Sequence, residues 1–356
     1  MCWSSIINAV PKMAPKKLLI PGPVNTRFNQ IVDLAPREKP SMCMIQSLRK
    51  NLLDIYKLSS KKYTTVLIPG SGTMCNEAVM RSFPRFVSAD ILSNGTYGER
   101  LIEISKYLDL QNNYFYFDEK EQIKLKDDHS KGQIVSMVHH ETGTGIRNNI
   151  EEILDIYPNE TITHIDAIST FGGIPFELEK HNVDFFVGSA NKCLHSFAGL
   201  SFVICKKSTL EKFKNVNSSL SLNLYHEWKY MDETNQFRFT PPMQLVNYLN
   251  QATRDLLNSG GIEKRYSEYK KLNKIVRDNL GDVLEEVVPN HDYLMTLYKH
   301  PDPEFDFQEF KEKLRTKNII VQDSVIFDKN LIRIGNIGEW TEKEMSETMK
   351  TLKKYL

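Results

Sequence analysis

The sequence has few cysteines and no long apolar run, and its charges almost cancel. Its cysteines are odd in number and show no paired spacing: Cys2, Cys43, Cys75, Cys193 and Cys205. This content indicates a reduced, intracellular location and argues against a disulfide framework. No apolar stretch approaches the roughly 18 residues that cross a membrane. With 46 basic and 45 acidic residues, the net charge of +1 predicts binding neither to nucleic acid nor to an anionic membrane.

The N-terminal segment lacks the basic region of a secretory signal peptide, and Ser4, Ser5 and Asn8 interrupt its apolar stretch. We therefore expect residues 1–17 to form a tail and the protein to be cytoplasmic. A mitochondrial leader is the alternative, but this segment contains no arginine.

Short apolar runs alternate with amphipathic stretches from about residue 60 onward. This alternation of strands and helices predicts an α/β fold with a mostly parallel sheet and helices on both faces. Ligands of such folds bind at the carboxyl ends of the strands. The expected strands cover residues 64–68, 89–93, 133–138, 163–167, 184–189 and 201–205.

Two helical stretches flank this pattern. Residues 44–58 place Ile45, Leu48, Leu52 and Ile55 on one buried face. Near residue 240 the alternation of strands and helices ends. There we expect Thr240 to cap a helix whose first residue is Pro241. The chain is too long for one simple core. We expect a large domain over residues 18–245 and a smaller C-terminal α+β domain over residues 246–356.

The run Gly70-Ser71-Gly72-Thr73 lies between an expected strand and an expected helix. Glycines allow close backbone approach, and the free amides at a helix N-terminus attract a dianion such as phosphate. The run is not a P-loop, because no Gly-Lys-Ser/Thr follows, and it lacks the third glycine of the dinucleotide fingerprint. A plain strand-to-helix turn is the alternative interpretation.

Asp166 and Lys192 each follow the end of an expected strand. An aspartate there can be a simple turn residue, but it can also face a ligand in the crevice of the sheet. Most lysines are solvated, whereas Lys192 follows a buried strand among small residues. Desolvation would lower its pKa and make the neutral amine available as a nucleophile.

These three features fit one cofactor, pyridoxal phosphate. Ser71, Gly72 and Thr73 would hold its phosphate, Asp166 would pair with the protonated ring nitrogen, and Lys192 would attach it covalently. The ring is an electron sink only while its nitrogen stays positive, so all three parts are needed.

The sequence resembles the class V aminotransferases of PLP fold type I, and within them the transaminases that act on 2-aminoethylphosphonate and pyruvate. The resemblance covers residues 18 to about 350 and implies a large domain with a mostly parallel seven-stranded sheet. The matching segments are IPGPVNT, GSGT with NEAV, SNGTYGER, VHHETGTG, DAISTFGGIP, SANKC, SLSLNLY, RFTPP and RIGNIGE.

The resemblance also implies roles for single residues. Tyr97 would stack on the cofactor ring, Thr142 would approach its phenolic oxygen, and Ser189 would help to hold its phosphate. Thr240 would reach the phosphate bound by a neighbouring subunit, which implies a homodimer with shared active sites. Arg333 would grip the anionic group of a small-molecule amino donor and then that of pyruvate. Arg37 is a second candidate for this role, with a solvated loop arginine as the alternative.

The sequence departs from the usual family pattern at Gly143, His195, Ser196 and Ala198, which leaves the amino donor open. A transaminase of alanine or serine with glyoxylate is the close alternative. A cysteine desulfurase would need a reactive cysteine in the C-terminal part, where the last cysteine is Cys205.

Two further alternatives have less support. A pseudoenzyme would not need Asp166, Lys192 and Arg333 together. No metal site is expected at His139-His140-Glu141, because adjacent side chains of a strand point to opposite faces.

Overall fold

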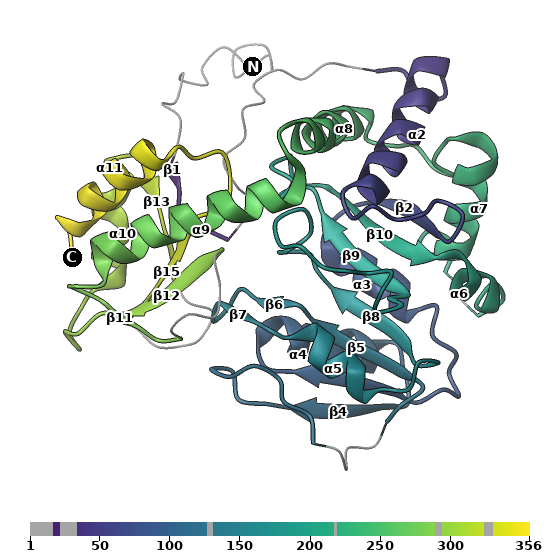
Figure 1. The fold of residues 1–356 in the computed structure, drawn as a ribbon, viewed down its shortest axis with the longest axis horizontal. Coiled ribbons are helices and arrows are strands. Elements are labelled where there is room, and N and C mark those ends of the chain that lie inside the picture. Colours follow the sequence, from purple (N-terminus) through teal and green to yellow (C-terminus); the bar gives the residue numbers. More distant parts are fainter. Residues whose placement is uncertain (1–16, 22–33, 127–130, 217–218, 289–293, 324–329) are drawn as a thin grey trace, which may run out of the picture.

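A seven-stranded sheet forms the centre of the larger part of the protein (Figure 1). The computed structural model describes residues 17–21, 34–126, 131–216, 219–288, 294–323 and 330–356. Within these residues the strand order of the sheet is β2-β10-β9-β8-β5-β3-β4. The strands are β2 (Tyr63–Pro69), β3 (Ala89–Ser93), β4 (Asn112–Tyr116), β5 (Ile134–Val138), β8 (Ile162–Asp166), β9 (Phe185–Ser189) and β10 (Leu200–Lys206).

All strands of this sheet run parallel except β10, which is antiparallel to both β2 and β9. The register pairs Val138 with Asp166 and Asp166 with Val187. The carboxyl ends of β5, β8 and β9 therefore meet at one edge of the sheet, as the α/β pattern predicts. The α/β class and the mostly parallel seven-stranded sheet are confirmed.

Helices cover both faces of the sheet, because alternate side chains of each strand enter different cores. On β5, Val135 and Met137 pack in the core that includes α2 (Lys39–Asp54), α5 (Ile150–Ile156) and α8 (Met243–Asn258). Ile134 and Val138 pack on the other face. The helices of that second core are α3 (Gly72–Met80), α4 (Thr96–Tyr107), α6 (Lys207–Lys212) and α7 (Leu224–Thr234).

The helix expected around residues 44–58 is α2, and its predicted buried face is confirmed. Ile45, Leu48 and Leu52 are buried on it, and Ile55 follows directly. Strand β4 was not expected, because its sequence NNYFY begins with two asparagines and it lies half-buried at the edge of the sheet.

The C-terminal part has its own small antiparallel sheet and its own core. The sheet order is β11 (Glu285–Glu286), β12 (Met295–Lys299), β15 (Leu331–Gly335) and β14 (Gln322–Asp323). Its helices are α9 (Gly261–Leu280), α10 (Phe307–Arg315) and α11 (Glu342–Lys353), and Figure 1 shows α9 and α11 side by side. Near the N-terminus, β1 (Lys17–Leu18) pairs with β13 (Ile319–Ile320) of this part. A short hairpin of β6 (His140–Glu141) and β7 (Ile146–Arg147) leaves the end of β5.

The predicted domain boundary between residues 245 and 246 falls inside α8. Val246 and Leu249 of this helix pack in the same core as α2, whereas Leu19 packs in the C-terminal core. The division at residue 245 stays a prediction, and this packing favours grouping α8 with the larger part.

The helix cap expected at Thr240 is wrong. Helix α8 begins at Met243, and the residue at its N-cap is Pro242. A residue that precedes a proline is disfavoured in the α conformation, so Pro241 cannot begin the helix directly before Pro242.

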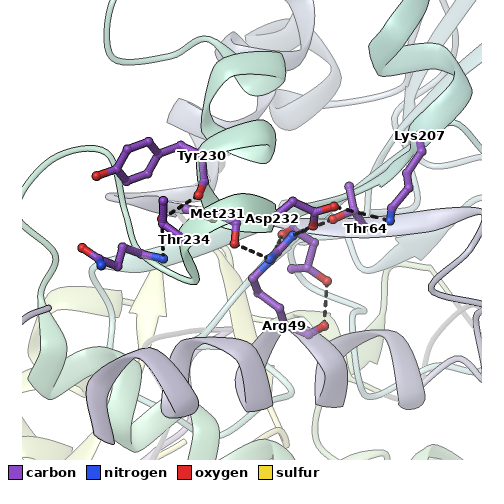
Figure 2. A network of polar contacts seen from close by, with 9 residues as sticks. Arg49, Thr64, Lys207, Tyr230, Met231, Asp232 and Thr234 are labelled. Atoms are coloured by element: carbon purple, nitrogen blue, oxygen red, sulfur yellow. Dashed lines mark hydrogen bonds and ion pairs between the residues drawn. The ribbon is translucent and has the colours of Figure 1, made fainter. Parts of the chain in front are cut away.

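Arg49 joins three elements on one side of the sheet (Figure 2). Its guanidinium donates to the Thr65 carbonyl, the Met231 carbonyl, the Thr64 hydroxyl and the Asp232 carboxylate, at 2.7–3.0 Å. All three guanidinium nitrogens thus have at least one acceptor, which offsets the cost of burying the charge. The network fixes α2 against β2 and α7.

Candidate active site

A cleft of about 350 Å³ lies at the carboxyl ends of β8 and β9. It is also bordered by the starts of α3 and α4. Eight of the residues predicted from the sequence line it, namely Ser71, Gly72, Thr73, Tyr97, Thr142, Asp166, Ser189 and Lys192. The tertiary structure thus brings together residues that lie up to 121 positions apart in the chain.

One end of the cleft is the N-terminus of α3. Ser71 precedes the helix in an extended conformation, and its side chain makes no capping hydrogen bond. A Cβ added at Gly72 would lie 2.3 Å from the Ile168 side chain, so only glycine allows this close approach. The Met74 amide donates to the Ser71 carbonyl, so the backbone amides of Gly72 and Thr73 and the positive end of the helix dipole are the groups available to an anion.

The Asp166 carboxylate is buried, with 5% of the residue exposed. Its Oδ1 accepts the Ile168 amide at 2.9 Å, and its Oδ2 accepts the Asn76 side-chain amide at 2.6 Å. Burial raises the pKa of Asp166, while these two hydrogen bonds and the charges of Arg100 and Lys192 oppose the rise. A cation placed against this carboxylate would stabilise its ionised form further.

The amine of Lys192 opens on the same cleft. It donates a hydrogen bond of 2.5 Å to the carbonyl of Pro21, which belongs to the N-terminal segment beside β15. Burial of the amine lowers the pKa of Lys192 to about 8, and the positive charges of Arg333 and Arg100 act in the same direction. A substantial fraction of this amine is therefore neutral and nucleophilic near neutral pH.

Glu141 fixes the start of the helix that carries Tyr97. Its carboxylate accepts the backbone amides of Tyr97 at 3.0 Å and Gly98 at 2.6 Å. Glu141 is fully buried, and this burial raises its pKa to about 7. The Arg100 guanidinium lies 4.9 Å from the centre of the Tyr97 ring and also lines the cleft.

Three predicted residues do not line the cleft in the described chain. Arg333 is buried on β15, and its guanidinium donates to the Thr142 carbonyl at 3.0 Å, so it contacts the wall of the cleft from behind. Thr240 is exposed just before α8. Arg37 is exposed before α2 with φ 69°.

Of the four departures from the family pattern, only Ala198 lines the cleft. His195 lies outside it, where its Nδ1 is 3.2 Å from Glu339 Oε1 and its Nε2 is 2.6 Å from the Tyr269 hydroxyl. It joins the loop after Lys192 to the C-terminal part, so its identity affects domain packing more directly than the donor pocket.

Four polar residues of the cleft wall were not singled out from the sequence: Asn76, Arg100, Ser169 and Asn191. Arg100 is three residues after Tyr97 and Asn76 is four after Gly72, so helical spacing could have found both. His140 lines the cleft, whereas His139 points to the Thr170 hydroxyl at 2.9 Å. No cluster of three or more metal-ligating side chains occurs among the described residues. Within the same residues, no helix has the length and apolarity needed to cross a bilayer.

Comparison with known proteins agrees with this arrangement of fold and cleft. Residues 102–323 match the family model described as aminotransferase class-V, and the chain belongs to the class V aminotransferase family. Several curated relatives that match nearly the whole chain are named 2-aminoethylphosphonate–pyruvate transaminase. The 2-aminoethylphosphonate–pyruvate transaminase of Phocaeicola vulgatus is 33% identical, covering 96% of this chain and 99% of the relative. The transaminase of the same name from Lysinibacillus sphaericus is 32% identical, with 97% and 98% coverage.

Solved structures share the fold at low sequence identity. An alanine–glyoxylate aminotransferase from Nostoc sp. superposes with a TM-score of 0.87 at 19% identity, covering 97% of this chain and 96% of that one. A PLP-bound phosphoserine aminotransferase from Trichomonas vaginalis has a TM-score of 0.76 at 15% identity, covering 96% and 100%. The chain therefore has the fold of PLP fold type I aminotransferases, and the family implies pyridoxal phosphate as cofactor.

Proposed function

We propose that the protein uses pyridoxal phosphate to move the amino group of 2-aminoethylphosphonate to pyruvate, giving phosphonoacetaldehyde and alanine reversibly. One observation carries the proposal: the Lys192 amine and the Asp166 carboxylate line a single cleft that begins at the N-terminus of α3. The relatives that are 32–33% identical over nearly the full chain support the choice of substrates. The likeness to an alanine–glyoxylate aminotransferase, at 19% identity, concerns the fold alone.

The residues of the cleft fit this cofactor. The amides after Ser71 and the hydroxyls of Thr73 and Ser189 would hold its phosphate, because a helix N-terminus stabilises a dianion. Tyr97 would stack on its ring, Thr142 would approach its phenolic oxygen, and the buried Asp166 carboxylate would keep its ring nitrogen protonated. When bound, pyridoxal phosphate supplies an aldehyde and an electron sink that is strongest while the ring nitrogen is positive.

The proton transfers are assigned to Lys192. Its neutral amine would hold the cofactor in the resting protein and would be freed once the amino donor is bound. The freed Nζ accepts a proton from the carbon that bears the donor's amino group. Nζ would pass this proton to the bound cofactor, and in the second half of the reaction it would take a proton back and deliver it to carbon 2 of pyruvate. A lysine whose pKa is about 8 can serve as base and acid in turn near that pH.

Arginine would recognise both anionic substrates. Arg333 stays charged at any working pH, and its planar fork suits phosphonate and carboxylate oxygens alike. Its position behind Thr142 would direct the anionic end of each substrate to the side of the cleft that faces the C-terminal part. Arg37 remains the second candidate, and from its exposed position it would act beside a partner subunit.

A homodimer belongs to the same proposal. Thr240 is exposed and lies outside its own cleft, which is compatible with a contact to the phosphate held by a partner subunit. We place the reaction in the cytoplasm because of the low cysteine content, with a mitochondrial location as the alternative.

The proposal is tested by a screen of amino donors that follows the conversion of pyruvate to alanine and, in parallel, of glyoxylate to glycine. We expect 2-aminoethylphosphonate with pyruvate to be the best pair, ahead of serine with either acceptor and of alanine with glyoxylate. Lys192→Ala should lose turnover by several orders of magnitude, whereas the exposed-lysine variant Lys180→Ala should keep it. Normal turnover in Lys192→Ala would contradict the cofactor chemistry, and a preference for serine or alanine with glyoxylate would contradict the substrate.

A further inference from the structure

The Asp166 carboxylate is the end of a line of buried polar side chains that leads away from the cleft. The Asn76 side-chain amide donates to Asp166 Oδ2 at 2.6 Å. His164 Nε2 lies 3.2 Å from Asn76 Oδ1, and the Ser136 hydroxyl lies 2.7 Å from His164 Nδ1. Ser136 and His164 are fully buried, and Asn76 is 2% exposed. The line thus joins β5, β8 and α3.

The hydrogen bonds of this line have one consistent direction. Because Asn76 turns its NH₂ group to Asp166, its carbonyl oxygen faces His164, so His164 Nε2 must carry a proton. Burial lowers the pKa of His164 to about 3, so the imidazole is neutral and Nδ1 is an acceptor. The Ser136 hydroxyl therefore donates to Nδ1, and every hydrogen bond of the line points toward the carboxylate.

Because these polar side chains are surrounded by apolar ones, they destabilise the fold unless each of them has its hydrogen-bond partner. The apolar core between the sheet and α3 encloses it, and the Phe83 ring meets the His164 ring edge-on with centres 6.1 Å apart. In such an environment a complete chain of hydrogen bonds strengthens each member, whereas an unpaired polar group is strongly destabilising. An apolar core would need none of these three residues, so their presence calls for a role at Asp166.

We propose that Asn76, His164 and Ser136 are positioning residues that hold Asp166 as a fixed, ionised carboxylate and so set how strongly the cleft retains a protonated ring nitrogen. The proposal rests on the proposed use of pyridoxal phosphate for its consequence, but the direction of the line does not depend on the cofactor.

The reverse direction requires a different charge on Asp166. If Asn76 were turned over, its carbonyl oxygen would face an ionised carboxylate oxygen at 2.6 Å, which is repulsive. This orientation becomes favourable only when Asp166 is protonated and can donate. The tautomer of His164 therefore reports the charge of Asp166 from inside the core.

The first measurement is ¹⁵N NMR of the full chain with labelled histidine, with and without pyridoxal phosphate. The His164 signals are assigned by their loss in His164→Gln. We expect a neutral ring protonated at Nε2 and unprotonated at Nδ1 in both samples. A ring protonated at Nδ1, or at both nitrogens, would overturn the proposed direction. This result is decisive even if the protein fails to bind pyridoxal phosphate, an outcome that would refute only the proposed function.

The second measurement is the affinity for pyridoxal phosphate together with the visible absorbance of the bound cofactor. Asn76→Leu removes the donor to Asp166, and we expect its Kd to rise about tenfold or more and its absorbance band to change. Ser136→Ala is a milder variant in which we expect a smaller rise in Kd and a mixture of His164 tautomers.

The matched control is Thr170→Val, which removes the hydroxyl that contacts Nδ1 of another buried histidine, His139. This control should bind the cofactor within twofold of the unmodified protein. Unchanged Kd and absorbance in folded Asn76→Leu and Ser136→Ala, or an equal loss in Thr170→Val, would show that the line has only a structural role.

Discussion

At the scale of single residues, the surroundings of Lys192 determine how much of its amine is neutral. Its amine donates to the Pro21 carbonyl, has lost most contact with water and lies near the positive charges of Arg333 and Arg100. Burial, and then these two positive charges, lower the pKa of Lys192 to about 8, while the Asp166 carboxylate limits the shift. A lysine in water would be almost fully protonated at the same pH.

This pKa predicts how fast the cofactor-free protein takes up pyridoxal phosphate. Only the neutral amine is nucleophilic, so the uptake rate should rise about tenfold per pH unit below pH 8 and level off above it. Stopped-flow absorbance between pH 6 and pH 10 measures the profile. Lys192→Ala should lack this phase. A rate that still rises steeply between pH 9 and pH 10 would show an ordinary lysine pKa.

At the scale of elements, the start of α4 depends on a residue outside the helix. The Gly95 N-cap offers no side chain, and Glu141 of β6 accepts the amides of Tyr97 and Gly98 in its place. The hairpin after β5 is thereby attached to the helix that carries Tyr97, the residue proposed to stack on the cofactor ring. Displacement of this carboxylate would release both Tyr97 and Arg100.

The raised pKa of Glu141 has a consequence for stability. A carboxyl whose pKa is higher in the folded state adds stability below its unfolded pKa of 4.5, and this contribution is lost as the pH rises to about 7. The shift corresponds to roughly 3 kcal/mol for this fully buried group. Calorimetry of the cofactor-free protein should therefore show the Tm of the unmodified chain falling relative to Glu141→Gln between pH 5 and pH 8.

Exposed Glu152 provides the matched control, since Glu152→Gln should follow the unmodified protein across this pH range. A constant Tm difference between the unmodified protein and Glu141→Gln would mean that Glu141 is ionised throughout. In that case the hydrogen bonds from the two backbone amides would lower the pKa of Glu141 by more than burial raises it.

At the scale of the whole molecule, the proposed dimer predicts that two chains complete each other's sites. Thr240→Ala should weaken binding of pyridoxal phosphate about tenfold, because a hydrogen bond to a charged phosphate is lost. In a mixed dimer of a Lys192→Ala chain and a Thr240→Ala chain, one cleft combines an intact Lys192 with the partner's intact Thr240. That cleft should bind and react normally.

Differently tagged chains, purified as mixed dimers, test this expectation. Sedimentation should give a dimer for the unmodified protein, and the mixed dimer should recover about half of the full activity at low cofactor concentration. A monomer in solution, or mixed dimers as weak as Thr240→Ala alone, would contradict the shared site.

Local patterns in the sequence determined most strands of the large sheet and the place of the cleft. The runs around β2, β3, β5, β8, β9 and β10 show their strands, because buried strands need several consecutive apolar residues. The glycine run at residues 70–73, Asp166 and Lys192 could be assigned to one cleft, because carboxyl ends of parallel strands meet at one edge. The edge strand β4 could not be predicted in this way, because a half-buried strand has fewer consecutive apolar residues.

Only the tertiary structure decided which distant side chains meet. The contact of Arg333 with Thr142 joins residues 191 positions apart, and the line from Ser136 through His164 and Asn76 to Asp166 passes through three elements. Neither pairing leaves a local pattern, because periodicity records which face of an element is buried and not what that face touches. The sequence by itself therefore determined the class of fold and named the candidate reactive residues, whereas tertiary packing decided how deeply they are buried and which charges lie beside them.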